Sequence, residues 1–106
     1  MEETQENIKI KIALSLNKLL DDSKSNTQQK KTGEELNISY SEIADNSDIR
    51  KATVSDIFNA KKSANTFTLF RLIKSMGYEL SDFAKKYDKI TDSEIINFKS
   101  RNKKDA

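Results

Sequence analysis

The chain has 106 residues, with 19 Lys and Arg against 17 Asp and Glu for a formal net charge of +2, and it contains neither Cys nor His. It therefore offers no thiolate nucleophile, imidazole base, disulfide, or nitrogen or sulfur ligand for zinc, and its two glycines are too few for a P-loop or a G-x-G-x-x-G phosphate cradle. We expect a single small domain that is not an enzyme and that uses no metal or cofactor.

Residues 1–22 are predicted to contain the first helix, because apolar side chains recur there at spacings of three and four and share one helical face. These side chains are Ile8, Ile12, Leu16, Leu19 and Leu20. Asp21 and Asp22 are expected to end the helix. Ile8, Ile10 and Ile12 also alternate with lysines, which is strand periodicity, so the first residues have an extended alternative; the length of the run favours a helix.

Residues 23–37 contain one aliphatic side chain among Ser, Thr, Asn, Gln and Lys, which predicts a polar loop. This loop is either a solvated excursion or an arm that touches phosphate. After it, Ser39 and Glu42 have the spacing of a capping box, so a helix is expected to open at Ser39.

The first helix after the loop is expected to bury Ile43 and Ala44 and to break at the polar run 46–48. A second short helix is expected from about Lys51 to Asn59. Asn65 and Thr66 are both suitable N-caps for a third helix, and Gly77 supplies its left-handed stop.

The last part of the chain has two further helix starts. Ser81 is expected to cap a helix that reaches Tyr87, and Thr91 with Glu94 has the spacing of a second capping box. A basic tail follows from residue 99 and is expected either to follow a DNA backbone or to lack fixed structure. The chain thus divides, within one domain, into a first helix 1–22, a polar loop 23–37, a core 38–87 and a C-terminal helix with basic tail 88–106.

The apolar and small residues of the core lie at the fixed offsets of a helix-turn-helix. The matching positions are Ile43, Ala44, Ile49, Val54, Ser55, Ile57, Leu69, Leu72, Met76, Gly77 and Leu80. With these positions residues 38–83 resemble, without a gap, the Cro/repressor (XRE-like) helix-turn-helix family. The resemblance implies an all-α, lambda-repressor-like DNA-binding domain of five or six helices, and a transcription regulator or repressor of bacterial or phage origin.

The resemblance also implies which residues meet double-stranded DNA. In relatives the second motif helix enters the major groove, and its base-reading positions carry over to Lys51, Ala52 and Asp56, with Thr53 and Ser55 beside them. Phosphate contacts carry over to the start of the first motif helix and the loop after the second one. The residues at these positions are Tyr40, Ser41, Asn59, Lys61 and Lys62, and Arg50 is expected next to the groove wall.

Several positions depart from the family pattern. Asp48 and Ala60 stand where glycine is usual, Tyr40 replaces a Gln that touches DNA in relatives, and Asp56 puts a negative charge into a polyanionic groove. Arg50 and Phe58 also replace a usual Ser or Thr and a usual Glu. A helix-turn-helix that binds protein and not DNA is therefore an alternative, and so is the antitoxin of a toxin–antitoxin pair.

A homodimer on a pseudo-palindromic operator is expected, because one such module contacts few bases. Its surface is expected within residues 83–98, where apolar side chains remain after the motif core is filled. The aromatic residues Phe67, Phe70, Tyr78, Phe83 and Tyr87 are expected in the core or at that surface.

The longest uncharged run, 63–70, is far too short to cross a bilayer, and the acidic start does not resemble a secretory signal, so a cytoplasmic protein without a membrane partner is expected.

Overall fold

The computed structural model describes residues 4–29 and 40–105, and every element within these ranges is a helix. In chain order the helices are α1 (Gln5–Gln29), α2 (Tyr40–Ser47), α3 (Lys51–Phe58), α4 (Thr66–Ser75), α5 (Leu80–Asp88) and α6 (Asp92–Asp105). The expected all-α fold is thus confirmed.

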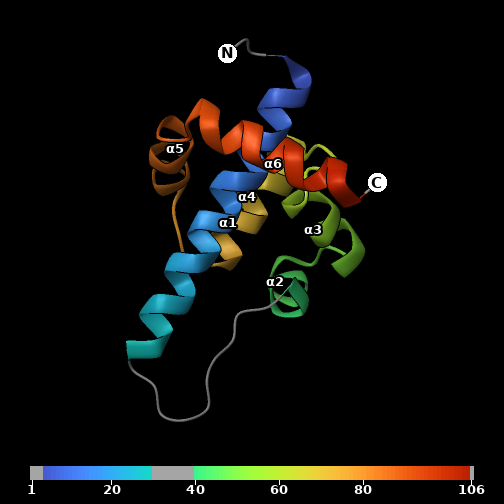
Figure 1. Ribbon diagram of the computed structural model, residues 1–106. Helices are drawn as coiled ribbons and strands as arrows, with labels where there is room; N and C mark the ends of the chain where they lie inside the picture. Colours follow the sequence, from blue (N-terminus) through green and yellow to red (C-terminus); the bar gives the residue numbers. More distant parts are fainter. Residues whose placement is uncertain (1–3, 30–39, 106) are drawn as a thin grey trace.

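Helix α1 runs the length of the molecule, with α6 crossing its N-terminal half and α5 and α3 on either side of it (Figure 1). The larger apolar cluster joins α1 to the four helices α2–α5 and includes Leu16, Phe58 and Leu72, each at most 1% exposed. A smaller cluster joins Ile10 of α1 to the α6 end of the chain. Because α1 belongs to both clusters, it holds the two halves of the chain in one body.

The expected end of the first helix at residues 21–22 is wrong, since α1 continues to Gln29 and includes the first part of the predicted loop 23–37. Tertiary contacts hold the first residues beyond the predicted end. The Asp22 carboxylate lies 2.6 Å from the Lys86 ammonium of α5, and the buried Ser23 hydroxyl donates to the Met76 carbonyl at 3.4 Å. Residues 30–37, and Ser39 with its expected capping box, lie outside the described residues.

The strand alternative for the first residues is also wrong, because Ile8, Ile10 and Ile12 all lie within α1. Their helical placement changes which of them is buried. Ile10 is 1% exposed in the smaller cluster, whereas Ile8 and Ile12, which were expected on the buried face, are only partly buried.

The three central helices begin and end close to the predicted residues. Helix α3 spans Lys51–Phe58 with Asn59 as its C-cap, and the Asn65 side chain accepts the Thr68 N–H at 2.8 Å as the N-cap of α4. Gly77 has a φ of +87°, the left-handed conformation expected of it.

The start of α5 differs from the prediction. Glu79, and not Ser81, is its N-cap, and the Asp82 carboxylate accepts the Glu79 N–H at 2.9 Å. In α6 the predicted capping box is confirmed: the Thr91 N–H donates to the Glu94 carboxylate at 2.9 Å, and the Glu94 N–H donates to the Thr91 hydroxyl at 3.2 Å. The basic tail is helical through Asp105.

Four large apolar residues of 83–98 are buried within the chain. Phe83 lies in the larger cluster, and Ile90, Ile95 and Phe98 lie in the smaller one, each at most 8% exposed. The apolar side chains on which the expected dimer surface rested are therefore largely used within the chain, and Ile96 is exposed. The large apolar side chains that the described residues expose are Phe67, Phe70, Leu80 and Ile96. No helix in the described ranges combines the length and the apolar character that a bilayer crossing requires.

Candidate nucleic-acid interface

Helix α3 buries one side in the core and leaves the other side facing solvent. Val54, Ile57 and Phe58 are at most 2% exposed. On the opposite side, spacings of three and four bring Lys51, Ala52, Ser55, Asp56 and Asn59 onto one face. Lys51, Ala52 and Asn59 are exposed and the other two are partly exposed, whereas Thr53 flanks this face. The structure thus brings the predicted base-reading residues together. We call this set of five residues the outer face of α3.

The turn before α3 is held by backbone geometry that glycine usually provides. Asp48 has a φ of +64°, and the Ile49 N–H donates across it to the Ala44 carbonyl at 3.1 Å. Asp and Asn adopt this left-handed conformation more readily than most residues, which explains why Asp is accepted here. Arg50 then adopts an extended conformation as the N-cap of α3, without a side-chain hydrogen bond to the helix.

The turn after α3 repeats the same geometry with an alanine. Ala60 has a φ of +60°, its N–H donates to the Ile57 carbonyl at 3.2 Å, and the Lys61 N–H donates to the Asp56 carbonyl at 2.7 Å. These two bonds form a Schellman motif, in which Ala60 occupies the position that favours glycine. The chain turns back at once, so the exposed Lys61 and Lys62 follow directly on the C-terminal end of α3.

The acidic residue on the outer face has a basic neighbour. The Asp56 carboxylate lies 3.9 Å from the Lys62 ammonium. This pair reduces the local negative charge that Asp56 would otherwise present to phosphate. It also places a base-reading candidate beside a phosphate-binding candidate.

Tyr40 packs into the protein more than a phosphate ligand requires. Its ring centroid lies 5.1 Å from that of the buried Phe58, with the ring planes tilted by 45°. Burial raises the pKa of the Tyr40 hydroxyl above its usual value of 10.0, and a hydrogen bond with Asn59 opposes that rise. The ring therefore couples the start of α2 to the end of α3.

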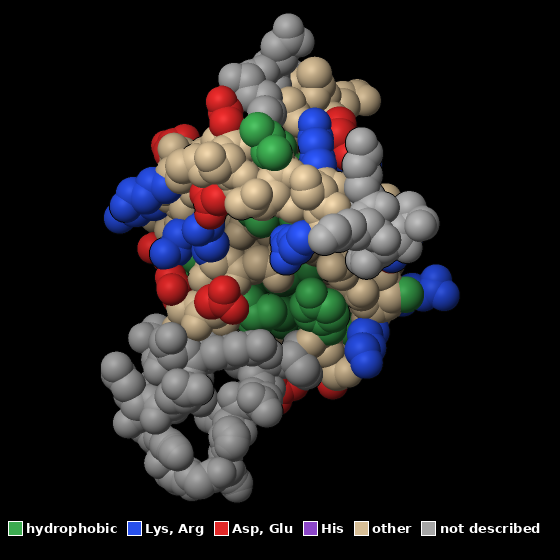
Figure 2. Space-filling view, viewed as in Figure 1, with side chains coloured by type: hydrophobic (Ala, Val, Ile, Leu, Met, Phe, Trp, Pro, Cys, Tyr) green, Lys and Arg blue, Asp and Glu red, His purple; other side chains and the backbone are tan. Residues whose placement is uncertain are grey.

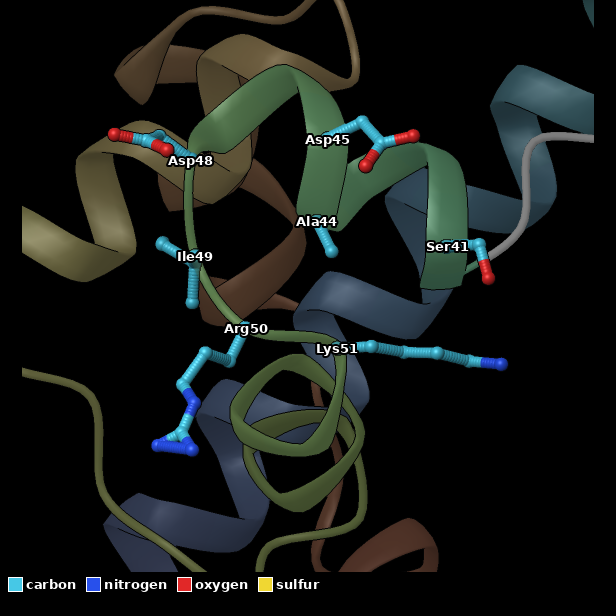
Figure 3. Close-up of a pocket in the computed structure, with 7 residues that line it drawn as sticks. All are labelled: Ser41, Ala44, Asp45, Asp48, Ile49, Arg50 and Lys51. Carbon is cyan, nitrogen blue, oxygen red and sulfur yellow. The ribbon is translucent and has the colours of Figure 1, made fainter.

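An open hollow of about 390 Å³ separates α2 from the N-terminal end of α3. Figure 3 shows Ser41 and Lys51 extending to one side of this hollow while Arg50 extends to another. Asp45 and Asp48 complete the rim with two negative charges. Ser41 and Lys51, predicted for phosphate and for bases respectively, are thus near neighbours in space.

Charge around the site is divided between the elements. The exposed acids Glu42, Asp45 and Asp48 belong to α2 and its turn, whereas the segment 50–62 carries four basic residues and one acid. In Figure 2, basic side chains project at the edge where α2 and α3 lie, and the visible described surface carries no broad patch of one sign. The positive charge of the segment 50–62 is therefore concentrated at the two ends of α3.

Two residues that the sequence reasoning missed contact the backbone of this site. The Asn17 amide of α1 donates to the Phe58 carbonyl at 2.9 Å, and the Arg71 guanidinium of α4 donates to the Ser47 carbonyl at 2.6 Å. For Asn17 nothing in the sequence pattern distinguishes it from its polar neighbours Ser15 and Lys18. For Arg71 nothing in the sequence pattern distinguishes it from other surface cations.

A protein-family model described as helix-turn-helix matches residues 30–83, which include α2, α3, α4 and the start of α5. Neither a curated protein nor a solved structure matches the chain.

Proposed function

The chain belongs to the Cro/repressor (XRE-like) helix-turn-helix family, and from this premise we propose that it is a sequence-specific DNA-binding transcription regulator. The observation that carries the proposal is the outer face of α3, which is mostly polar and is exposed or partly exposed at all five positions. An α-helix with its side chains measures about 10–12 Å across. The major groove of B-DNA is about 12 Å wide and admits such a helix.

In this proposal the outer face of α3 reads bases. Lys51 donates to O6 and N7 of a guanine, Ala52 contacts a thymine methyl group, and Asp56 accepts from N4 of a cytosine. Thr53 and Ser55 contribute hydroxyl groups at the side of this set. The Asp56–Lys62 pair supports the assignment, because it lowers the electrostatic cost of bringing a carboxylate into the groove.

Phosphates are held on both sides of the groove. Ser41 and Arg50 act at the N-terminal end of α3, and Asn59, Lys61 and Lys62 act at its C-terminal end. Tyr40 contributes through its hydroxyl group alone, since its ring is packed against Phe58. A regulator of this kind acts by binding, so the proposal includes no catalytic step.

We further propose that the protein binds as a homodimer, because eight residues of helix reach too few base pairs for strong discrimination. Two copies related by a two-fold axis would read a pseudo-palindromic site. Light scattering of the protein–duplex complex tests this point. Two chains per selected duplex are expected, and one chain per duplex would contradict the homodimer.

The alternatives from the sequence are an antitoxin and a protein-interaction module without DNA affinity. The prediction of a protein-interaction module had two grounds, the charge of Asp56 and the presence of Tyr40 in place of Gln. The pairing of Asp56 with Lys62 weakens the first of these grounds. The antitoxin reading shares the DNA-binding face and adds a toxin partner, so it stays a prediction that a co-purifying toxin would support.

Selection of preferred sequences from random duplexes, followed by titration at two salt concentrations, tests the proposed function. A preferred sequence and an affinity that falls steeply with salt are expected, because each Lys that neutralises a phosphate releases a counterion. Lys61→Ala should weaken all sequences alike and lower the salt slope by about one. Lys85 lies on the exposed surface of α5, across α1 from α3 (Figure 1), so Lys85→Ala should leave both the affinity and the salt slope unchanged. Absence of duplex binding at low salt would overturn the proposal.

A further inference from the structure

The last backbone carbonyls of α2 and α3 are satisfied by side chains from outside the motif. A helix leaves its final four carbonyls without partners inside the helix. In α3, the carbonyls of Ser55, Asp56 and Ile57 accept N–H groups from the turn that follows. The fourth, Phe58, accepts the Asn17 amide of α1 at 2.9 Å. In α2 the Ser47 carbonyl accepts the Arg71 guanidinium in the same way.

Asn17 is committed to the backbone in two directions. Its amide nitrogen donates to the Ala13 carbonyl of its own helix at 2.8 Å as well as to the Phe58 carbonyl. An amide nitrogen carries two hydrogens, so both are used in these bonds. Asn17 therefore cannot rotate to another partner without leaving a carbonyl unsatisfied, and it ties α3 to α1 at a fixed distance.

The bond lies at the C-terminal end of α3 and so affects where the outer face of α3 points. Phe58 fills the core beneath the helix end, but apolar contacts are non-directional and allow a short helix to tilt. A hydrogen bond is directional and sets where the helix end lies relative to α1. Asp56, two residues before, and Asn59, directly after, move with the Phe58 carbonyl.

We propose that Asn17 is a positioning residue that fixes the tilt of α3, and hence the register of the outer face against base edges. This proposal rests on the proposed DNA-binding function. Base contacts require the donor and acceptor atoms to meet within a few tenths of an ångström, whereas phosphate contacts by long Lys side chains tolerate a shifted helix. Loss of the Asn17 bond therefore lowers discrimination between sequences and leaves non-specific binding in place.

Asn17→Leu tests the proposal, because leucine keeps the branched four-atom skeleton of the asparagine side chain and has no donor. Thr91→Ala is the matched control, since it removes the N-cap hydroxyl of α6 and leaves the Asn17–Phe58 bond in place. Both variants are expected to lose stability. In Asn17→Leu the ratio of affinities for selected and scrambled duplexes should fall about tenfold, with the salt slope unchanged. In Thr91→Ala the ratio should equal that of the wild type.

A second measurement separates this proposal from the proposed function. Residual dipolar couplings of the N–H groups in α3 and in α1, measured together, report the direction of α3 relative to α1 in the free protein. A changed direction in Asn17→Leu but not in Thr91→Ala is expected. An unchanged direction with unchanged discrimination would overturn the positioning role. If the wild type bound no duplex, the proposed function would be wrong and no ratio of affinities could be compared. The couplings would still decide whether Asn17 sets the tilt of α3.

Discussion

Three single residues determine where the central helices stop, and each adopts a positive φ. They are Asp48 after α2, Ala60 after α3 and Gly77 after α4, with φ values of 64°, 60° and 87°. The sequence alone predicts the left-handed stop at Gly77, because glycine is the usual residue there. The resemblance to the family indicates the other two positions, but only the structure shows that Asp and Ala keep the glycine conformation.

Ala60→Gly should stabilise the protein by about 0.5–1 kcal/mol, because an alanine in the left-handed region is strained and glycine is not. Urea denaturation measures the change. Asp48→Gly should gain less, since Asp adopts this conformation at lower cost. The same replacement inside α3, Ala52→Gly, is the control and should destabilise by about 1 kcal/mol. A loss of stability in Ala60→Gly would contradict the assigned strain.

Glu94 is the residue whose charge makes stability depend on acid. Its carboxylate lies 2.8 Å from the Lys18 ammonium, and its pKa is lowered first by this hydrogen bond and then by the one from the Thr91 N–H. A lowered folded-state pKa contributes stability above the usual value of 4.5, and that contribution is lost as the pH falls through the folded value.

Glu94→Gln removes the charge but keeps an acceptor for the capping box. At pH 7 the variant should be less stable by up to about 1 kcal/mol, the range for a partly exposed ion pair. Thermal unfolding from pH 7 down to pH 3 measures the difference. It should disappear in acid, where the wild-type carboxylate is protonated. A difference that stayed constant over this range would show that the charge of Glu94 plays no part.

At the scale of elements, the sequence predicts best the helix boundaries that depend on neighbouring residues. The cap at Asn65, the capping box at Thr91 and the stop at Gly77 are short-range signals and are confirmed, whereas the cap expected at Ser81 is wrong. The continuation of α1 past residue 22 is not predicted, because its contacts are with Lys86 and Met76, which are distant in sequence. The tie between α1 and α3 through Asn17 is long-range in the same sense.

Arg71 is the corresponding link between α4 and the turn of the motif. Its guanidinium donates to the Ser47 carbonyl and lies 4.0 Å from the Asp48 carboxylate. Arg71→Ala should destabilise the protein by about 1–2 kcal/mol, because a carbonyl at the helix end loses a charged donor. Urea denaturation measures the loss. Lys85→Ala, an equally cationic change on α5, should stay within about 0.5 kcal/mol of the wild type, and an equal loss in both variants would contradict a specific role for Arg71.

At the scale of the whole molecule, a net charge of +2 by itself says little about DNA binding, and the distribution of the charges over the surface is more informative. Acidic residues on α2 offset the bases that lie at both ends of α3. The sequence pattern predicted the helix-turn-helix, its outer face and the charged groups around it. The dimer surface expected in 83–98 stays a prediction, but Phe83, Ile90, Ile95 and Phe98 are buried within the chain, which a pattern of spacings cannot reveal.

The central claim is that α3 reads DNA bases through its outer face. The most direct test is the affinity of the wild type, Lys51→Ala and Lys85→Ala for the selected duplex and for the same duplex with the guanine opposite Lys51 replaced. The account predicts that Lys51→Ala loses about 1–3 kcal/mol of discrimination at that base pair, while Lys85→Ala keeps the discrimination of the wild type. Equal discrimination by all three proteins would contradict it.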